Sequence, residues 1–244
     1  MQIHMLADTV RPILGTTAFE DSMTTVLPRA SVFRPVSPSK GALRDACKED
    51  VLNLVFTAPA QLSGTYAAAR ETFAKDQNCA VLDSRTFAAG QLLLMQKAYE
   101  MAQNEKFSVH LLRNLRRTSR KLCCYFVAPN GSALRLSGAK KPILSIPFRF
   151  TVFRIGSEGE IHRHANVYAA TPQQALYRCV YPHLKKGMCT AIADDRAGEA
   201  AEALSNLLTR RQASVLRGEC IPTDLPFGPG EFLSVAFLKE EVSR

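Results

Sequence analysis

Apolar and polar positions in the first half of the chain follow two alternating patterns. Short apolar runs predict strands at residues 51–56, 80–82 and 122–127. Helical spacing of apolar residues predicts helices at residues 66–75, 90–102 and 109–121. Strands that alternate with helices in this way are typical of right-handed crossovers between parallel strands. This half therefore favours a mainly parallel sheet flanked by helices.

The second half of the chain has a different pattern. Residues 148–155 alternate between apolar and polar positions, and a turn at 156–159 leads into another strand, which is typical of a β-hairpin. Further strands are predicted at 188–193, 213–217 and 232–238, and helices at 172–184 and 197–211. Thr171 is the expected N-cap of the first of these helices, with Pro172 at its first position. This half indicates an α+β arrangement with a mixed or antiparallel sheet.

A basic, turn-rich segment at residues 137–142 separates the two halves. A chain of 244 residues is long enough to bury a core in each of two small domains. We therefore expect an N-terminal α/β domain over residues 1–136 and a C-terminal α+β domain over residues 137–244.

Composition places the chain among ordinary globular proteins, with 46% hydrophobic and 22% charged residues. No apolar run approaches the roughly 20 residues of a membrane span, and the first residues lack the pattern of a signal peptide. The seven cysteines are an odd number without a C-x-x-C pair, which favours a reducing compartment over a disulfide framework. We therefore expect a cytoplasmic protein.

The net charge of +9 raises the question of anionic partners. The densest basic cluster is Arg113, Arg116, Arg117, Arg120 and Lys121, on a predicted helix. One interpretation is the solvated face of an amphipathic helix, and another is a docking surface for an acidic partner protein. No nucleic-acid motif or aromatic stacking platform is present, so we expect no nucleic-acid partner. Transient contact with a membrane surface is compatible with this charge.

The most informative local pattern is Leu62-Ser63-Gly64-Thr65-Tyr66, between a buried strand and a helix. Ser63 or Thr65 can cap the helix, and Gly64 lets another group approach the backbone. Exposed N–H groups and the helix dipole favour a carboxylate or phosphate here. The alternative is a simple cap without a ligand. The end of the next strand, with Ser84, is expected beside this turn.

The sequence offers no catalytic or metal-binding arrangement. It contains neither a G-x-S-x-G elbow nor a phosphate-binding loop, and Ser63 has no histidine near it in the chain. His162-x-His164 lacks further ligands for a metal. Asp194-Asp195 is interpreted as a strand-to-helix turn with a cap. We therefore expect a non-catalytic protein that needs no cofactor and no metal.

The strand, Leu62–Tyr66, the following helix, residues 81–84 and Gly90 together resemble the core signature of the DegV family. Further segments resemble other parts of that family in the same order. They are Met5–Thr9, Pro38-Ser39 with residues 41–43, residues 144–146, Gly159-Glu160-Ile161, and Gly228-Pro229-Gly230. The resemblance spans nearly the whole chain.

The resemblance implies a two-domain α/β protein that encloses one long-chain fatty acid and presents its carboxylate to a separate fatty acid kinase. By position, Ser63, Gly64 and Thr65 would contact the carboxylate, and Ser37 and Ser39 would lie opposite. The remaining cleft positions implied by the resemblance are Leu62, Ser84, Gly228 and Gly230.

Some positions depart from the family pattern. The contact threonine of the family falls on Pro35, and its contact histidine falls on Pro226. A basic segment that would help to meet the kinase falls near residues 166–168, without its arginine. Two alternatives to a fatty acid carrier therefore stay open. One is a regulatory module that has lost kinase coupling and binds another anionic small molecule, and the other is an enzyme that uses the same cleft.

Overall fold

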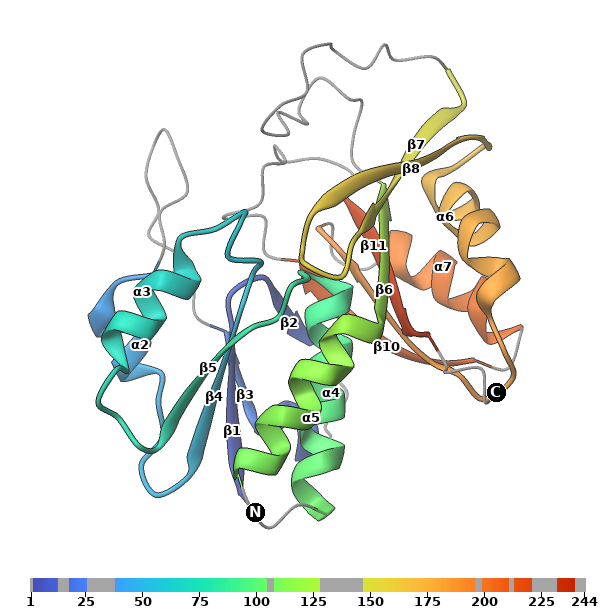
Figure 1. The fold of residues 1–244 in the computed structure, drawn as a ribbon. Coiled ribbons are helices and arrows are strands. Elements are labelled where there is room, and N and C mark those ends of the chain that lie inside the picture. Colours follow the sequence, from blue (N-terminus) through green and yellow to red (C-terminus); the bar gives the residue numbers. More distant parts are fainter. Residues whose placement is uncertain are drawn as a thin grey trace.

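The computed structural model describes residues 2–12, 18–25, 38–104, 108–127, 147–195, 199–210, 213–220 and 232–239. Its strands form two β-sheets, and helices lie between and outside them (Figure 1). This confirms the expected α/β class. The segment 137–142, where a domain boundary was expected, lies outside the described residues, as do residues 144–146.

The first sheet has four parallel strands. Their order is β3 (Met23–Thr25), β1 (Ile3–Ala7), β4 (Leu52–Thr57) and β5 (Cys79–Asp83). One face, with Leu6 and Val55, packs with residues of helices α2 (Lys40–Asp45) and α3 (Thr65–Thr72). The other face, with Met5, Leu54 and Phe56, joins the central core of the protein. Both faces are covered, as a parallel sheet requires.

The second sheet has seven strands. Their order is β2 (Val10–Pro12), β10 (Ser214–Cys220), β9 (Cys189–Asp194), β11 (Leu233–Leu238), β6 (Leu122–Val127), β7 (Arg149–Ile155) and β8 (Ile161–Tyr168). Strands β9 and β10 are parallel, and all other neighbours are antiparallel. The expected mixed sheet and the expected hairpin of β7 and β8 are confirmed.

Strand β6 departs from the parallel sheet that the alternation in the first half predicts. It pairs antiparallel with β11 and β7 in the second sheet. The connection from β5 to β6 also differs from that of a β-α-β unit. Helix α4 (Ala89–Asn104) is followed closely by α5 (Ser108–Lys121), so a pair of helices replaces the single crossover of a β-α-β unit. The six buried residues of β6 suit an inner strand of the large sheet.

Helix α4 lies between the two sheets and contacts strands of both, including β1, β9, β10 and β11. An aromatic cluster continues this central core. It consists of Phe87, Phe126, Phe153 and Phe232, whose neighbouring ring centroids lie 5.2–6.0 Å apart. The apolar interior is therefore continuous from one sheet to the other.

Two helices cover the outer face of the second sheet, α6 (Pro172–Val180) and α7 (Glu199–Thr209). Thr171 caps α6 as expected, with its side chain accepting the N–H of Gln174. The α-helix ends at Val180 rather than at Leu184, and a 3₁₀ turn, η1 (Tyr181–His183), follows. Pro182 explains this early end, because it has no N–H to donate.

The short elements near the N-terminus are not predicted by the apolar pattern. They are β1, β2, β3 and the one-turn helix α1 (Ala18–Asp21). Two of these strands have three residues, which is too short for a period to be recognised. Within the described part of the chain, no helix is long and apolar enough to cross a membrane.

Candidate ligand site at the carboxyl edge of the parallel sheet

The carboxyl ends of β1, β4 and β5 meet at one edge of the first sheet. Ala7 is paired with Phe56, and Thr57 with Asp83. The segment that begins at Asp83-Ser84 therefore lies beside the one that follows β4, as the sequence suggested. Ligands of open α/β sheets bind at such an edge.

A buried polar network holds the backbone at this edge. Both carboxylate oxygens of Asp8 accept the N–H of Ala58, at 3.0 and 2.9 Å, and one accepts Gln91 Nε2 at 2.9 Å. Gln91 Oε1 accepts the N–H and the hydroxyl of Thr9, at 3.2 and 2.7 Å. Thr9 Oγ1 in turn accepts the N–H of Ala88 at 3.1 Å. The network ties β1 to the segment after β4 and to the start of α4.

Sequence reasoning missed Gln91, whose side chain is fully buried. The sequence does contain an indication of this role, since Gln91 is the one amide side chain in the otherwise apolar run Gly90-Gln91-Leu92-Leu93-Leu94-Met95. A buried polar side chain needs hydrogen-bond partners, so such a position predicts a buried network.

The turn after β4 leads directly into helix α3. The N–H groups of Leu62 and Ser63 both donate to Pro59 O, at 2.8 and 3.1 Å. Gly64 is the N-cap residue, with φ −75° and ψ −6°, and no side chain caps the helix there. Ser63 and Thr65 are therefore not the N-cap residue, although the Ser63 hydroxyl does accept the N–H of Thr65, the first residue of α3. The turn already has helical dihedral angles at Gly64, whereas a side-chain cap needs an extended residue.

Ser63 and Thr65 nevertheless form a hydroxyl pair at the start of α3. Their hydroxyl oxygens lie 2.9 Å apart, and Ser63 Oγ also accepts the N–H of Thr65 at 3.1 Å. Thr65 is buried, Ser63 is half-buried, and Gly64 is exposed. Two hydroxyl groups and the first N–H groups of the helix thus gather beside an exposed backbone position.

The other expected site residues have different surroundings. Leu62 is half-buried and packs against the central core. Ser84 is fully buried, with its hydroxyl 2.6 Å from Thr57 O and 2.7 Å from Thr86 O, so it joins backbone segments. Ser39 caps α2 by accepting the N–H of Ala42 at 3.0 Å. The expected site residues outside the described part of the chain are Ser37, Gly228 and Gly230.

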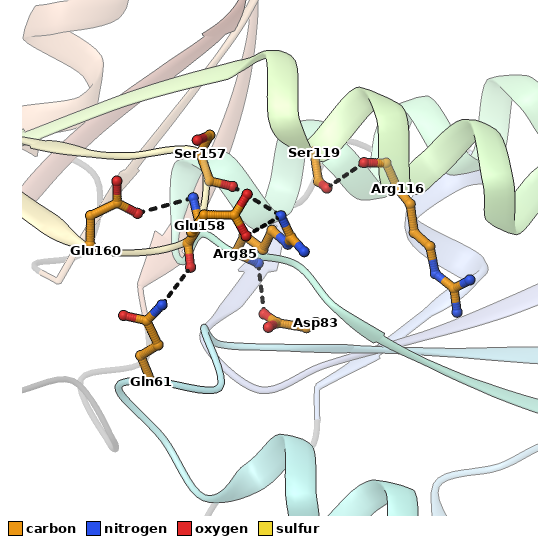
Figure 2. Close-up of polar contacts among 8 residues, drawn as sticks. All are labelled: Gln61, Asp83, Arg85, Arg116, Ser119, Ser157, Glu158 and Glu160. Carbon is orange, nitrogen blue, oxygen red and sulfur yellow. Dashed lines mark hydrogen bonds and ion pairs between the residues drawn. The ribbon is translucent and has the colours of Figure 1, made fainter.

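The tip of the β7–β8 hairpin lies against this edge (Figure 2). Arg85 Nη1 pairs with Glu158 Oε2 at 2.6 Å, and Gln61 Nε2 donates to Glu158 O at 3.2 Å. Gly159 has φ +91°, and a Cβ atom there would lie 2.7 Å from Cβ of Pro59. The hairpin of the second sheet therefore reaches across to both segments that follow β4 and β5.

Glu160 fixes the shape of the hairpin tip. Its carboxylate accepts the N–H of Glu158 at 3.0 Å and lies 3.1 Å from Nε2 of His162. A backbone N–H of its own residue and His162 lower the pKa of this carboxyl group. His164 and His183 lie elsewhere, with ring centroids 5.0 and 6.4 Å from that of Tyr125. Across the described ranges, no group of three or more metal-binding side chains is found.

A separate hollow of about 540 Å³ opens at the carboxyl end of β9. Its apolar side includes Phe150 and Phe232, and its polar side includes Asp194 and Asp195. Asp194 accepts the N–H of Ala201 at 3.0 Å, and Asp195 accepts that of Phe232 at 2.9 Å. Both aspartates thus hold backbone around a strand-to-helix turn, in line with their interpretation from sequence. Ser63, Gly64 and Thr65 do not line this hollow.

The model of a family described as "Uncharacterised protein, DegV family" matches residues 34–159. No curated protein matches the chain.

The solved structures similar to this one cover almost all of it. A DegV family protein from Eubacterium eligens, loaded with heptadecanoic acid, has a TM-score of 0.79 at 12% identity and covers 98% of this chain and 100% of its own. A Ruminococcus gnavus protein of the DegV family, with vaccenic acid, has a TM-score of 0.76 at 14% identity and coverages of 96% and 99%. The fatty acid kinase (Fak) B3 protein of Streptococcus pneumoniae, loaded with linoleic acid, has a TM-score of 0.72 at 14% identity and coverages of 98% and 100%. With the family model matching more than half of its residues, this chain belongs to the DegV family.

Proposed function

We propose that this protein binds a long-chain fatty acid between two domains and holds the carboxylate at the Ser63–Thr65 turn. The observation that carries the proposal is the position of this turn. Its hydroxyl pair lies at the carboxyl edge of the parallel sheet, while the adjacent Leu62 packs into the core that spans both sheets. The polar groups of the turn and the apolar interior of the protein are thus less than one helical turn apart. This arrangement suits an amphiphilic ligand, which has a polar head and an apolar chain.

The chemistry of the turn suits a carboxylate. The hydroxyl pair of Ser63 and Thr65 and the N–H groups of the first turn of α3 supply hydrogen-bond donors, of which one O–H is used within the pair and the N–H of Thr65 is donated to Ser63 Oγ. Bonds from such donors to an ionised acceptor are stronger than neutral ones, and the helix dipole adds to them. The likeness to three structures that carry fatty acids supports the same ligand class here.

In this proposal the protein is a carrier and not an enzyme. Gly64 is exposed beside the hydroxyl pair, so a bound carboxylate would be reachable by a second protein. The likeness to the pneumococcal Fak B3 protein supports a fatty acid kinase as that partner. The domains proposed to close on the ligand are residues 1–136 and 137–244. Strands β2 and β6 of the N-terminal domain would then belong to the same sheet as the strands of the C-terminal domain.

A cytoplasmic location belongs to this proposal. All seven cysteines are free thiols, as expected in a reducing compartment. No cofactor is required for binding and presentation, and the fatty acid is the bound ligand.

A second candidate follows from two positions in the sequence. Pro35 and Pro226 stand where the resemblance implies a threonine and a histidine that contact the carboxylate. A proline side chain can donate no hydrogen bond. The same turn could then serve a regulatory module that binds another anionic small molecule without a kinase.

Mass spectrometry under native conditions tests the proposal. The purified protein is expected to carry an adduct of the mass of a long-chain fatty acid. Ser63→Ala should weaken fatty acid binding by roughly 1–2 kcal/mol, the worth of one charge-assisted hydrogen bond. The matched control is Ser214→Ala, because Ser214 is an exposed serine at the start of β10.

The alternative outcomes are separable by thermal unfolding in the presence of ligands. Repeated preparations without an adduct, and no stabilisation by added fatty acids, would contradict the carrier. Stabilisation by an anionic metabolite that Ser63→Ala abolishes would favour the second candidate. Equal fatty acid affinity in both serine variants would remove Ser63 from the site.

A further inference from the structure

Helix α5 presents a strongly basic face to solvent. Its fourteen residues contain no aspartate or glutamate, and its exposed positions include Arg113, Arg116, Arg117 and Arg120. We call these four side chains the arginine face. On the opposite side Leu111 and Leu115 are fully buried in the central core, so the helix cannot turn this face inward.

The arginine face has no acidic partner in the described part of the chain. None of its four side chains takes part in an ion pair there. Figure 2 shows Arg116 extending away from Ser119 and from the pair of Arg85 and Glu158. By contrast, Arg85 and Glu158 neutralise each other at 2.6 Å. The charge of the arginine face is therefore available to an external anion.

The shape of this region is an open hollow along the helix. It has a volume of about 540 Å³ and is lined by the arginine face together with Val109 and Leu112. Val109 is 63% exposed, so the hollow presents an aliphatic side chain beside the cationic ones. The four arginines span two turns of the helix, or roughly 10 Å along its axis. The ligand should therefore be extended, anionic and tolerant of an apolar side chain.

We propose that the arginine face of α5 binds the surface of an anionic phospholipid bilayer. Headgroups adjust to the spacing of the arginines, so no complementary pocket is needed. The boundary between headgroups and acyl chains also accommodates exposed Val109, which a polyphosphate or a nucleic-acid backbone does not. An acidic protein is the competing occupant, since arginine is also common at protein interfaces, and the test below separates the two.

This proposal goes beyond the proposed function, since the arginine face acts without a bound fatty acid. It assigns lipid headgroups to the arginine face, and it gives the Ser63–Thr65 turn no part in this binding. If the protein is also a carrier, the arginine face brings it to the bilayer from which a poorly soluble fatty acid is drawn.

Co-sedimentation with vesicles tests the proposal. The full chain should bind vesicles of phosphatidylcholine mixed with phosphatidylglycerol, and not phosphatidylcholine alone. Binding should weaken steeply with added NaCl, because salt screens exposed charges. Replacing all four arginines of the face by glutamine should lower the partition constant at least about tenfold, since each basic residue near such a surface contributes roughly fivefold. Glutamine retains helix propensity, so the fold should persist.

The matched control carries the same change of charge elsewhere. Arg44, Arg163, Lys186 and Arg210 are exposed on other elements, and their replacement by glutamine should leave vesicle binding within about twofold of the unchanged protein. Circular dichroism and thermal unfolding of both variants confirm that each is folded.

Two results would overturn the proposal. One is equal vesicle binding by the two quadruple variants, and the other is no binding of the unchanged protein to anionic vesicles at low salt. Binding to poly-glutamate in place of vesicles would assign the arginine face to an acidic protein. Fatty acid content is measured on the same samples, so loss of the carrier function would be recognised separately from loss of bilayer binding.

Discussion

Replacing Gly159 by alanine tests how closely the two sheets approach each other. Gly159 lies at the tip of the β7–β8 hairpin, with φ +91°. A Cβ atom there would lie 2.7 Å from Cβ and 3.2 Å from Cγ of Pro59, in the segment that follows β4. Pro59 belongs to a rigid turn, because its carbonyl accepts the N–H groups of Leu62 and Ser63. The added methyl group should therefore push the hairpin away from the ligand edge.

Three contributions set the size of this effect, two that destabilise the folded protein and one that offsets them. An alanine with positive φ costs about 1–2 kcal/mol. Forcing a methyl group into a filled space costs about a further 1–3 kcal/mol. Alanine also restricts the unfolded chain, which offsets about 0.4–1 kcal/mol. Gly159→Ala should thus lower the free energy of unfolding by roughly 1–5 kcal/mol.

Gly187→Ala is the matched control. Gly187 also has positive φ, at +76°, but a Cβ atom there would meet nothing within 4 Å. It should show the cost of the backbone conformation without the clash. The difference between the two variants in urea denaturation therefore measures the contact between hairpin and turn.

Fatty acid binding provides a second measurement. Gly159→Ala should weaken it, since the displaced hairpin borders the turn with Ser63, whereas Gly187→Ala should not. Equal free energies of unfolding for the two variants would refute the close approach of the hairpin to Pro59. A double variant with Pro59→Gly should recover part of the loss if the clash is its cause.

Two further predictions concern buried polar groups. Gln91→Met should lower the free energy of unfolding in urea by about 3 kcal/mol, because Asp8 and Thr9 lose hydrogen bonds in a buried network. The same change at half-buried Gln96 of α4 should cost less than about 0.5 kcal/mol, and equal losses would contradict the network. Burial and the nearby Lys48 lower the pKa of His4 from 6.5, so the unfolded chain binds its proton more readily and stability should fall as the pH drops below 6.5. His4→Gln should reduce this fall in thermal unfolding temperature, and an unchanged pH dependence would exclude His4 as its source.

Much of the fold follows from local pattern. Strand β6 is predicted at its observed bounds, because its buried side chains form one uninterrupted apolar run. Helix α5 is also predicted within one residue, because its buried leucines recur at helical spacing between basic residues. Placing β6 in a sheet needs its partners, however, and these come from residues 149–155 and 233–238. The spacing of apolar residues within β6 does not show which strands it will pair with.

The candidate site, too, is predicted from the sequence only in part. The sequence indicates the turn around Ser63, because a strand, a small-residue turn and a helix follow one another. The contacts that shape it come from elsewhere in the chain. Gln61 meets Glu158 and Arg85 meets the same residue, at sequence separations of 97 and 73 positions. Gln91 reaches Asp8 across 83 positions.

The amino-acid sequence by itself determined which segments beyond residue 50 become strands and helices, that a polar turn follows β4, and which family the chain resembles. These are properties of neighbouring residues, set by the spacing of apolar side chains and by backbone preferences of glycine and proline. Only the tertiary structure decided that β6 joins the mixed sheet, that Gly64 rather than Ser63 is the N-cap residue of α3, and that a hairpin meets the ligand edge. Those outcomes depend on which distant surfaces bury each other, and burial is a property of the whole chain.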